Sequence, residues 1–360
     1  MSINDIIMFI MAVGILLGGA DCILNNKFGL GEKFEEGFMC LGPTALSMVG
    51  IICLSPKLAQ LLEPVIVPVF RLIGADPAMF ASILAIDMGG YPLALALAED
   101  AQVGYFSGLI VSTMLGATIV FTIPVGLGMI QSEDRVYFAK GLLIGLVPVP
   151  VGALVGGLMM GLPAACVLVN LIPILIIGIL LVLGLLFAQE KMVKGFIYFG
   201  RGIKILTVIG LSAAAFEYMT GIVLIQGMPP IMECMETVAG ICIVLLGSLP
   251  LMNLILRLLR KPFGTAGKAL GLDSASIAGM LFSCISVLPV FRMIKDMCPK
   301  GKVVTTAFLV SSIAVFSAHL GFTAGVRPEL LVPMMAAKLL SGVLAVGLAL
   351  IFEKGKRLDG

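Results

Sequence analysis

Apolar runs of about 20 residues recur along the whole of this 360-residue chain. Runs of that length are the sequence signature of helices that cross a lipid bilayer. Only 12% of the residues are charged, compared with roughly 25% in soluble domains. Because the runs are continuous rather than alternating, a membrane β-barrel is not expected. The sequence therefore predicts an all-α polytopic membrane protein.

Nine segments are long and apolar enough to cross a bilayer: 6–25, 39–54, 104–130, 136–160, 163–188, 205–225, 237–251, 303–324 and 330–352. Four further segments fit a single straight span less well. Segments 57–73 and 250–268 are amphipathic, whereas 76–98 and 273–294 are interrupted by Gly or Pro, which break helices. We therefore expect about 9–11 transmembrane helices and two broken, re-entrant hairpins at 76–98 and 273–294.

The two interrupted segments share a pattern. Asp76 and Pro92 are sixteen residues apart in the first segment, as are Asp273 and Pro289 in the second. Further correspondences follow in the same order: Pro56 with Pro250, Pro68 with Pro262, LIVST at 109–113 with FLVSS at 308–312, and AKGLL from 139 with AKLLS from 337. This consistent order indicates an internal duplication.

The duplication divides the chain into a first repeat at 1–162, a linking transmembrane helix at 163–190 and a second repeat at 191–360. Glu99 and Asp100 follow the first hairpin. Basic residues, in contrast, surround the end of the second hairpin: Arg292, Lys295, Lys300 and Lys302. Because basic loops stay in the cytoplasm, we expect an inverted-topology repeat with the N-terminus outside and the C-terminus in the cytoplasm. Inverted repeats with broken helices are typical of secondary transporters, whose binding site lies near the midplane.

Asp87 is the sharpest candidate for a binding residue, because it directly precedes the helix-breaking sequence Met-Gly-Gly-Tyr-Pro. A carboxylate at the bilayer centre costs about 2.5–3.5 kcal/mol and needs a partner, a proton or a water-filled cavity. Interrupted backbone is tolerated there only where it is buried in protein or lines a cavity. The pattern predicts a polar pocket at a hairpin tip, suited to a cationic substrate. The structural alternative is an acid that caps the broken helix or pairs with Lys338.

Four other residues of the hairpins could contribute to such a pocket. The ring of Tyr91 could face an ammonium group through a cation–π contact, or it could simply line the cavity. Ser82, Ser283 and Ser286 could hydrogen-bond a substrate hydroxyl, although serines in helices also bond to their own backbone.

Titratable residues elsewhere could bind the substrate, provide access for it or relay protons. Glu217 and Asp21 lie late in the first helix of each half, where they could balance a cation or simply lie near water. Glu99 and Asp100 flank the first hairpin and could lie on the access path. His319 is the only histidine and could relay protons or be a neutral, hydrogen-bonded residue of the core.

Several classes of protein are disfavoured. The eight cysteines are scattered singly without a Cys-x-x-Cys pair, so no metal site is expected. There is no Walker A sequence, which argues against direct ATP-driven transport by this chain. We expect no cofactor, no enzymatic activity and no nucleic-acid partner.

Two stretches, ASILAIDMGGYPLALALA at 81–98 and LGPTALSMVGIICLSP at 41–56, resemble the ethanolamine-utilisation permease family, usually called EutH. The similarity covers essentially the whole chain. It implies a multi-pass permease of the bacterial cytoplasmic (inner) membrane that imports ethanolamine, with the lipid bilayer as its environment. A homo-oligomer is compatible with this.

Ethanolamine carries one ammonium and one hydroxyl group, so one carboxylate, one or two hydroxyls and an aromatic wall would be enough to bind it. The alternatives are a permease for another small metabolite, such as a nucleoside, or a cation channel. Against a nucleoside, the spans contain few Asn and Gln residues to recognise a base.

Overall fold

The computed structural model of the chain describes residues 3–84 and 87–354. Within these residues the structure is helical and contains no β-strand. The first half contains α1 (Ile3–Ile23), α2 (Gly31–Met39), α3 (Leu41–Ile73), α4 (Met79–Leu84), a 3-10 turn (Asp87–Gly89), α5 (Gly90–Leu97), α6 (Ala101–Tyr105), two π-helical stretches (Phe106–Gly116 and Thr118–Thr122), α7 (Ile123–Met129), a 3-10 turn (Ser132–Asp134), α8 (Arg135–Leu146) and α9 (Val149–Met159).

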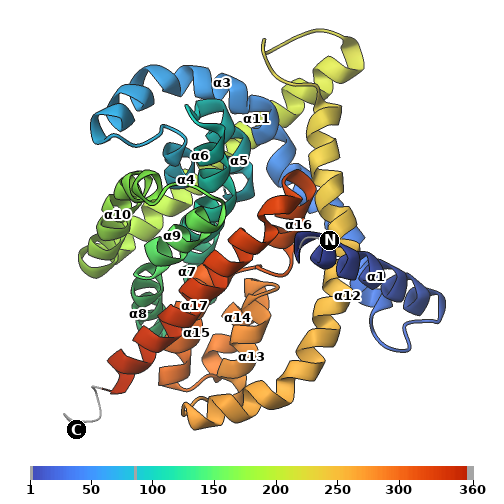
Figure 1. Cartoon of the computed structure of the whole chain (residues 1–360), viewed down its shortest axis with the longest axis vertical. Helices are drawn as coiled ribbons and strands as arrows, with labels where there is room; N and C mark the ends of the chain where they lie inside the picture. The colour runs from blue at the N-terminus through green and yellow to red at the C-terminus, as the bar shows by residue number, and fades with distance from the viewer. Residues whose placement is uncertain (1–2, 85–86, 355–360) are drawn as a thin grey trace.

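The linking helix α10 (Ala164–Phe187) leads into the second half. This half contains α11 (Gln189–Thr220), α12 (Ile231–Ala269), α13 (Ser274–Ser283), α14 (Val287–Met293), a 3-10 turn (Ile294–Asp296), α15 (Pro299–Ser312), α16 (Ala318–Val326), a 3-10 turn (Pro328–Leu330) and α17 (Leu331–Lys354). Figure 1 shows α1 and α12 along one side of the molecule, and α8, α9 and α10 on the other.

Eight helical stretches of the described residues are long and apolar enough to cross a membrane: 3–23, 31–73, 101–129, 132–159, 164–187, 194–220, 231–258 and 328–353. Each overlaps one of the segments expected from the sequence. The remaining expected segment, 303–324, is divided into α15 and α16 by non-helical residues 313–317. Apolarity alone could not reveal this break, because the interruption contains neither Gly nor Pro.

The amphipathic segments 57–73 and 250–268 are continuations of α3 and α12, which run for 33 and 39 residues. Both helices contain prolines, which remove a backbone hydrogen bond and bend a helix. The bent final part of α3 lies at the top of Figure 1, and that of α12 lies at the bottom. The two amphipathic segments therefore lie at opposite ends of the molecule.

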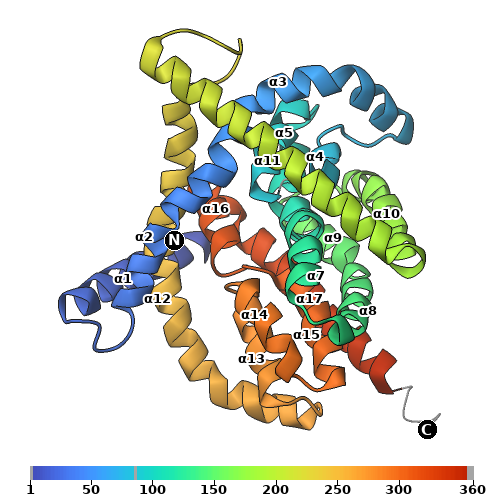
Figure 2. The same cartoon turned by 180° about the vertical axis from the view of Figure 1, so that it is seen from behind.

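Close glycine contacts join the two halves reciprocally. A Cβ atom on Gly14 of α1 would lie 2.5 Å from the carbonyl oxygen of Gly247 in α12. Likewise, a Cβ atom on Gly210 of α11 would lie 2.2 Å from the carbonyl oxygen of Gly50 in α3. Figure 2 shows α11 crossing α3. Each contact joins the first helix of one half to the long proline-containing helix of the other, α12 or α3, as a two-fold relation between the halves predicts. The division at 1–162, 163–190 and 191–360 and its inverted sense remain predictions.

The centre of the bundle is formed by the π-helical stretches and α15. Every residue of Phe106–Gly116 is buried, and so is most of α15. The hydroxyl of Thr118 donates to the carbonyl of Val310 at 3.1 Å, which joins these segments directly. These segments occupy matching positions in the two predicted repeats, and the two hairpins pack against them.

Candidate functional site

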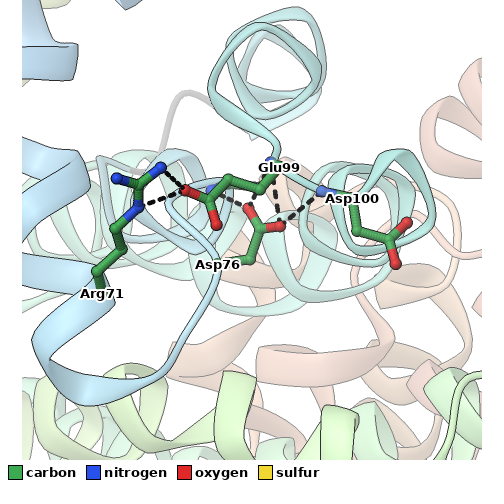
Figure 3. Close-up of polar contacts among 5 residues, drawn as sticks. Arg71, Asp76, Glu99 and Asp100 are labelled. Carbon is green, nitrogen blue, oxygen red and sulfur yellow. Dashed lines mark hydrogen bonds and ion pairs between the residues drawn. The ribbon is translucent and has the colours of Figure 1, made fainter.

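A carboxylate closes the base of each hairpin. Asp76 accepts hydrogen bonds from the backbone N–H groups of Glu99 at 3.1 Å and Asp100 at 2.9 Å (Figure 3). Asp273 accepts from the backbone N–H groups of Ser276 at 2.7 Å and Cys298. The chain therefore enters and leaves each hairpin at the same place, which is the geometry of a re-entrant segment.

Glu99 and Asp100, expected on the access path, are both engaged at the base of the first hairpin. Glu99 forms an ion pair with Arg71 at 2.7 Å, which Figure 3 shows beside Asp76. The carboxylate of Asp100 accepts from the N–H of Gln102 at 2.8 Å and caps the N-terminus of α6. Both side chains are exposed, so they remain accessible to solvent while they order this turn.

The same hydrogen bond fastens each hairpin to the central segment behind it. The Ser107 hydroxyl donates to the carbonyl of Ala78 at 2.7 Å, and the Thr305 hydroxyl donates to the carbonyl of Ser276 at 3.0 Å. Ser82 is buried and its hydroxyl lies 2.5 Å from that of Ser107. The structure therefore places Ser82 in the contact between the first hairpin and the π-helical stretch.

The tip of the second hairpin explains the break between α15 and α16. The carbonyl groups of Ser283 and Cys284 accept from the N–H groups of Ala314 at 2.9 Å and Phe316 at 3.0 Å. Ala314 has a left-handed backbone with φ of 50°, which is unfavourable for a residue with a Cβ atom. The hairpin tip satisfies backbone donors that the interrupted helix cannot pair, and it thereby stabilises the interruption.

Three predicted site residues lie at this second tip. The Ser283 hydroxyl donates to the carbonyl of Met280 at 2.7 Å, so it is bonded within its own helix. Ser286 is half-buried and precedes α14 in an extended conformation. His319 is buried, and its Nδ1 lies 2.9 Å from the carbonyl oxygen of Ile313. The structure therefore brings His319 and both serines together around the helix break.

The tip of the first hairpin contains the 3-10 turn Asp87–Gly89. The side chain of Asp87 lies outside the described part of the structure, so the predicted pocket around it stays a prediction. Met88 and Tyr91 pack against the apolar cluster that also holds Ile285 of the second tip and the buried ring of Phe322. Both hairpin tips therefore reach one cluster in the interior of the bundle.

Tyr91 lies in an aromatic cluster with Tyr105 and Phe322. Its ring is stacked on Tyr105 with centroids 6.3 Å apart, and it meets Phe322 edge-on at 5.6 Å. The guanidinium carbon of Arg327 lies 4.2 Å from the centre of the Tyr105 ring. No local sequence pattern connects Tyr105 with Arg327, because the two residues are 222 positions apart.

Lys338 is the least expected feature of the core. Its side chain is fully buried in α17, and its Nζ donates to the main-chain carbonyl of Thr113 at 2.5 Å. An ionisable residue inside a membrane protein is costly and is usually retained for function. The sequence signal was a single lysine within an apolar span, which we considered only as a partner for Asp87.

Asp21 and Glu217 have different surroundings. Asp21 is buried and accepts from the backbone N–H groups of Phe28 at 2.9 Å, Leu30 at 2.7 Å and Gly31 at 3.0 Å. It therefore orders the turn between α1 and α2, which favours a structural role over an access site. Glu217 is half-buried in the last turn of α11.

The hydrogen bonds by which Asp273 closes the base of the second hairpin are expected to weaken in acid. Burial raises the pKa of Asp273, but hydrogen bonds from the backbone N–H groups of Ser276 and Cys298 outweigh it, so the pKa lies below its usual range. A carboxyl group with a depressed pKa stabilises the fold above about pH 4, its unfolded value, and this contribution is lost as the pH falls through the folded pKa.

We expect Asp273→Asn to destabilise the fold at pH 7 by about 1–2 kcal/mol, at the lower end for a charge-assisted bond because the site is half-exposed. The measurement is thermal unfolding of the purified protein from pH 7 to pH 3. The difference between wild type and variant should shrink below pH 4. A difference in melting temperature that is constant across this pH range would contradict a stabilising role for the Asp273 charge.

Two hairpins with closed bases, whose tips meet one interior cluster beside interrupted helices, define a class of protein. In secondary membrane transporters, discontinuous helices of this kind form the substrate site. A family described as "Ethanolamine utilisation protein, EutH" matches residues 3–352, and the chain belongs to this family.

Three relatives from different bacteria match this chain over nearly their whole length. The chain is 46% identical over 351 residues to "Probable ethanolamine permease EutH" of Listeria monocytogenes, covering 97% of this chain and 94% of the relative. It is 40% identical over 390 residues to the protein of the same name from Escherichia coli, covering 98% and 96%. It is also 45% identical over 350 residues to "Uncharacterized protein YxeR" of Bacillus subtilis, covering 97% and 95%. No solved structure shows significant similarity to this chain.

Proposed function

We propose that this protein is a permease that imports ethanolamine across the bacterial cytoplasmic membrane. The observation that carries the proposal is the near-full-length similarity to relatives named probable ethanolamine permeases. The fold supports it, because eight apolar helical stretches of the described residues are long enough to cross a membrane and two hairpins converge on one interior cluster. A permease moves its substrate unchanged, so no catalytic residue is required.

We infer that residues of the two hairpin tips bind the substrate's two polar groups. Asp87 would offer the negative charge for the ammonium group, and Ser286, at the second tip, would offer a hydroxyl. A cation is drawn inward by a membrane potential that is negative inside, by about 2.3 kcal/mol per 100 mV, or roughly 50-fold at equilibrium. Accumulation therefore does not require a coupling ion.

The transport test is exchange in proteoliposomes. We expect labelled ethanolamine to enter, and to enter faster when the vesicles are preloaded with unlabelled ethanolamine, because a carrier returns more quickly when it is loaded. A cation channel would give flux without this acceleration. A nucleoside permease would be inhibited by nucleosides and not by ethanolamine. Either of these results would remove the proposed function.

We further propose that the N-terminus lies outside, the C-terminus lies in the cytoplasm, and the two hairpins enter from opposite sides. The opposite charges at their bases support this: Glu99 and Asp100 at one, and Lys295 and Lys300 at the other. The opposite placement of the late parts of α3 and α12 in Figure 1 also agrees with it.

Cysteine labelling tests this topology. Asp100→Cys should react with a membrane-impermeant thiol reagent added outside intact cells, whereas Lys300→Cys should react only after the membrane is opened. Both positions are at hairpin bases where the side chain is exposed or half-buried. The parent protein measures the background from native cysteines. Reaction of both positions from the same side would contradict inverted repeats.

A further inference from the structure

A cation of the protein itself occupies the aromatic cluster defined above. Arg327 holds its guanidinium 4.2 Å from the centre of the Tyr105 ring and donates to the Tyr105 hydroxyl. The Tyr91 side chain also interacts with this guanidinium. Tyr91 comes from the first hairpin, whereas Arg327 follows α16 in the second half. One ion thus joins the two halves of the molecule.

This contact lies between solvent and the hairpin tips. The Arg327 side chain is 39% exposed and lies 3.3 Å from the exposed carboxylate of Glu329. Phe322, which meets Tyr91 edge-on, is fully buried. Met88 and Ile285, one from each hairpin tip, pack against the same apolar cluster as Phe322. Removing the guanidinium would therefore uncover the part of the Tyr105 ring that it covers, beside the ring of Tyr91.

We propose that the Tyr91–Tyr105 pair is a cation site on the path of ethanolamine, and that Arg327 closes this site as a gate. The guanidinium occupies the place that the substrate ammonium takes when the gate is open. Both ions bind aromatic faces by the same attraction, so each can replace the other. The identity of the cation rests on the proposed function, whereas the gate rests on the geometry alone.

The exchange also accounts for selection of cations. Glu329 is two residues from Arg327 and already contacts its guanidinium at 3.3 Å, so it provides an alternative partner when the guanidinium leaves the ring. A neutral molecule of similar size offers nothing that compensates Tyr105 for losing the arginine. The site should therefore discriminate ethanolamine from ethanol before either reaches the hairpin tips.

The gate is tested without substrate by labelling Met88→Cys, a partly buried position in the same interior cluster as the rings, with a membrane-impermeant thiol reagent. Arg327→Gln should increase the labelling rate roughly 2- to 30-fold, the equilibrium equivalent of a cation–π contact. Arg327→Lys retains a cation and should label at the rate of the parent. The matched control is Arg201→Gln, because Arg201 lies 5.9 Å from the ring of the exposed Tyr198 on α11; it should change nothing.

The cation site is tested by fluorescence, because the chain contains no tryptophan. Tyr105→Trp introduces one emitter at the site and keeps an aromatic face for Arg327. Ethanolamine should change its emission, whereas ethanol at the same concentration should not. In the double variant with Arg327→Gln, where no guanidinium competes for the ring, the response should appear at lower ethanolamine concentrations.

The outcomes distinguish the Arg327 gate from the cation site at Tyr91 and Tyr105. Equal Met88→Cys labelling in the parent and in Arg327→Gln overturns the gate, and so does faster labelling in Arg327→Lys. Faster labelling in Arg327→Gln alone supports the gate. If the gate stands but the Tyr105→Trp emission ignores ethanolamine while proteoliposomes import it, the cation site is overturned. If ethanolamine is neither imported nor sensed, the proposed function fails and the gate remains.

Discussion

Asp87→Asn is expected to weaken ethanolamine binding about 10- to 150-fold, because a hydrogen bond to a charged group contributes roughly 1.5–3 kcal/mol. Asparagine keeps the size of the side chain and part of its hydrogen bonding but removes the charge that would face the ammonium group. The variant should still fold, because a neutral amide is no harder to bury than a carboxylate. Ethanolamine affinity and thermal unfolding of the purified protein are the two measurements.

The control for Asp87 is Glu63→Gln, which removes a carboxylate from an exposed position on α3 and should leave affinity unchanged. If Asp87 were a structural acid, the result would reverse, with a lower melting temperature and normal affinity in the folded fraction. Normal affinity in a well-folded Asp87→Asn protein would exclude a counter-ion role, and Glu217 would become the next candidate.

Lys338→Met should reduce transport by a similar factor, about 10- to 150-fold, because it removes the charged donor to the Thr113 carbonyl. This bond joins α17 of the second half to the π-helical stretch of the first. Methionine has a similar length and carries no charge whose burial costs free energy, so the melting temperature should hold. The uptake rate should therefore fall while the melting temperature of the purified variant does not.

Lys140→Met is the matched control for Lys338. Lys140 occupies the corresponding position of the predicted first repeat, but it is only half-buried and pairs with Glu353 near the end of α17. Loss of this pair should affect transport little. If Lys338→Met lowered the melting temperature and transported normally per folded molecule, Lys338 would be a structural residue and this prediction would be wrong.

The hairpins and most of the long helices could be predicted from the sequence because their causes are local. An apolar run of about 20 residues is sufficient to cross a bilayer, and Gly and Pro clustered at 89–92 disfavour a continuous straight helix. The matching positions of Asp76 and Asp273 are also a property of the sequence. Their function at the hairpin bases was not, because each carboxylate accepts from backbone N–H groups more than 20 residues away.

The candidate site itself depends on contacts between distant segments. No residue of 313–317 is a helix breaker, yet the helix is interrupted there because carbonyl groups at the second hairpin tip pair with its N–H groups. Ser82 and Asp21, two of the candidate binding or access residues, are bonded to Ser107 and to a backbone turn, because a buried hydroxyl or carboxylate must be satisfied by whatever the fold brings near.

The sequence by itself determined that this protein lies in a membrane and that it contains two broken hairpins. Its motifs also resemble those of the ethanolamine permease family. Those properties follow from hydropathy, helix-breaking residues and residue order, all of which act along the chain. Only the tertiary structure decided that Arg327 lies on Tyr105 and Lys338 on Thr113, pairs separated by 222 and 225 residues. Helix packing sets such contacts, because side chains from two halves of the chain meet only after both halves have folded around one core.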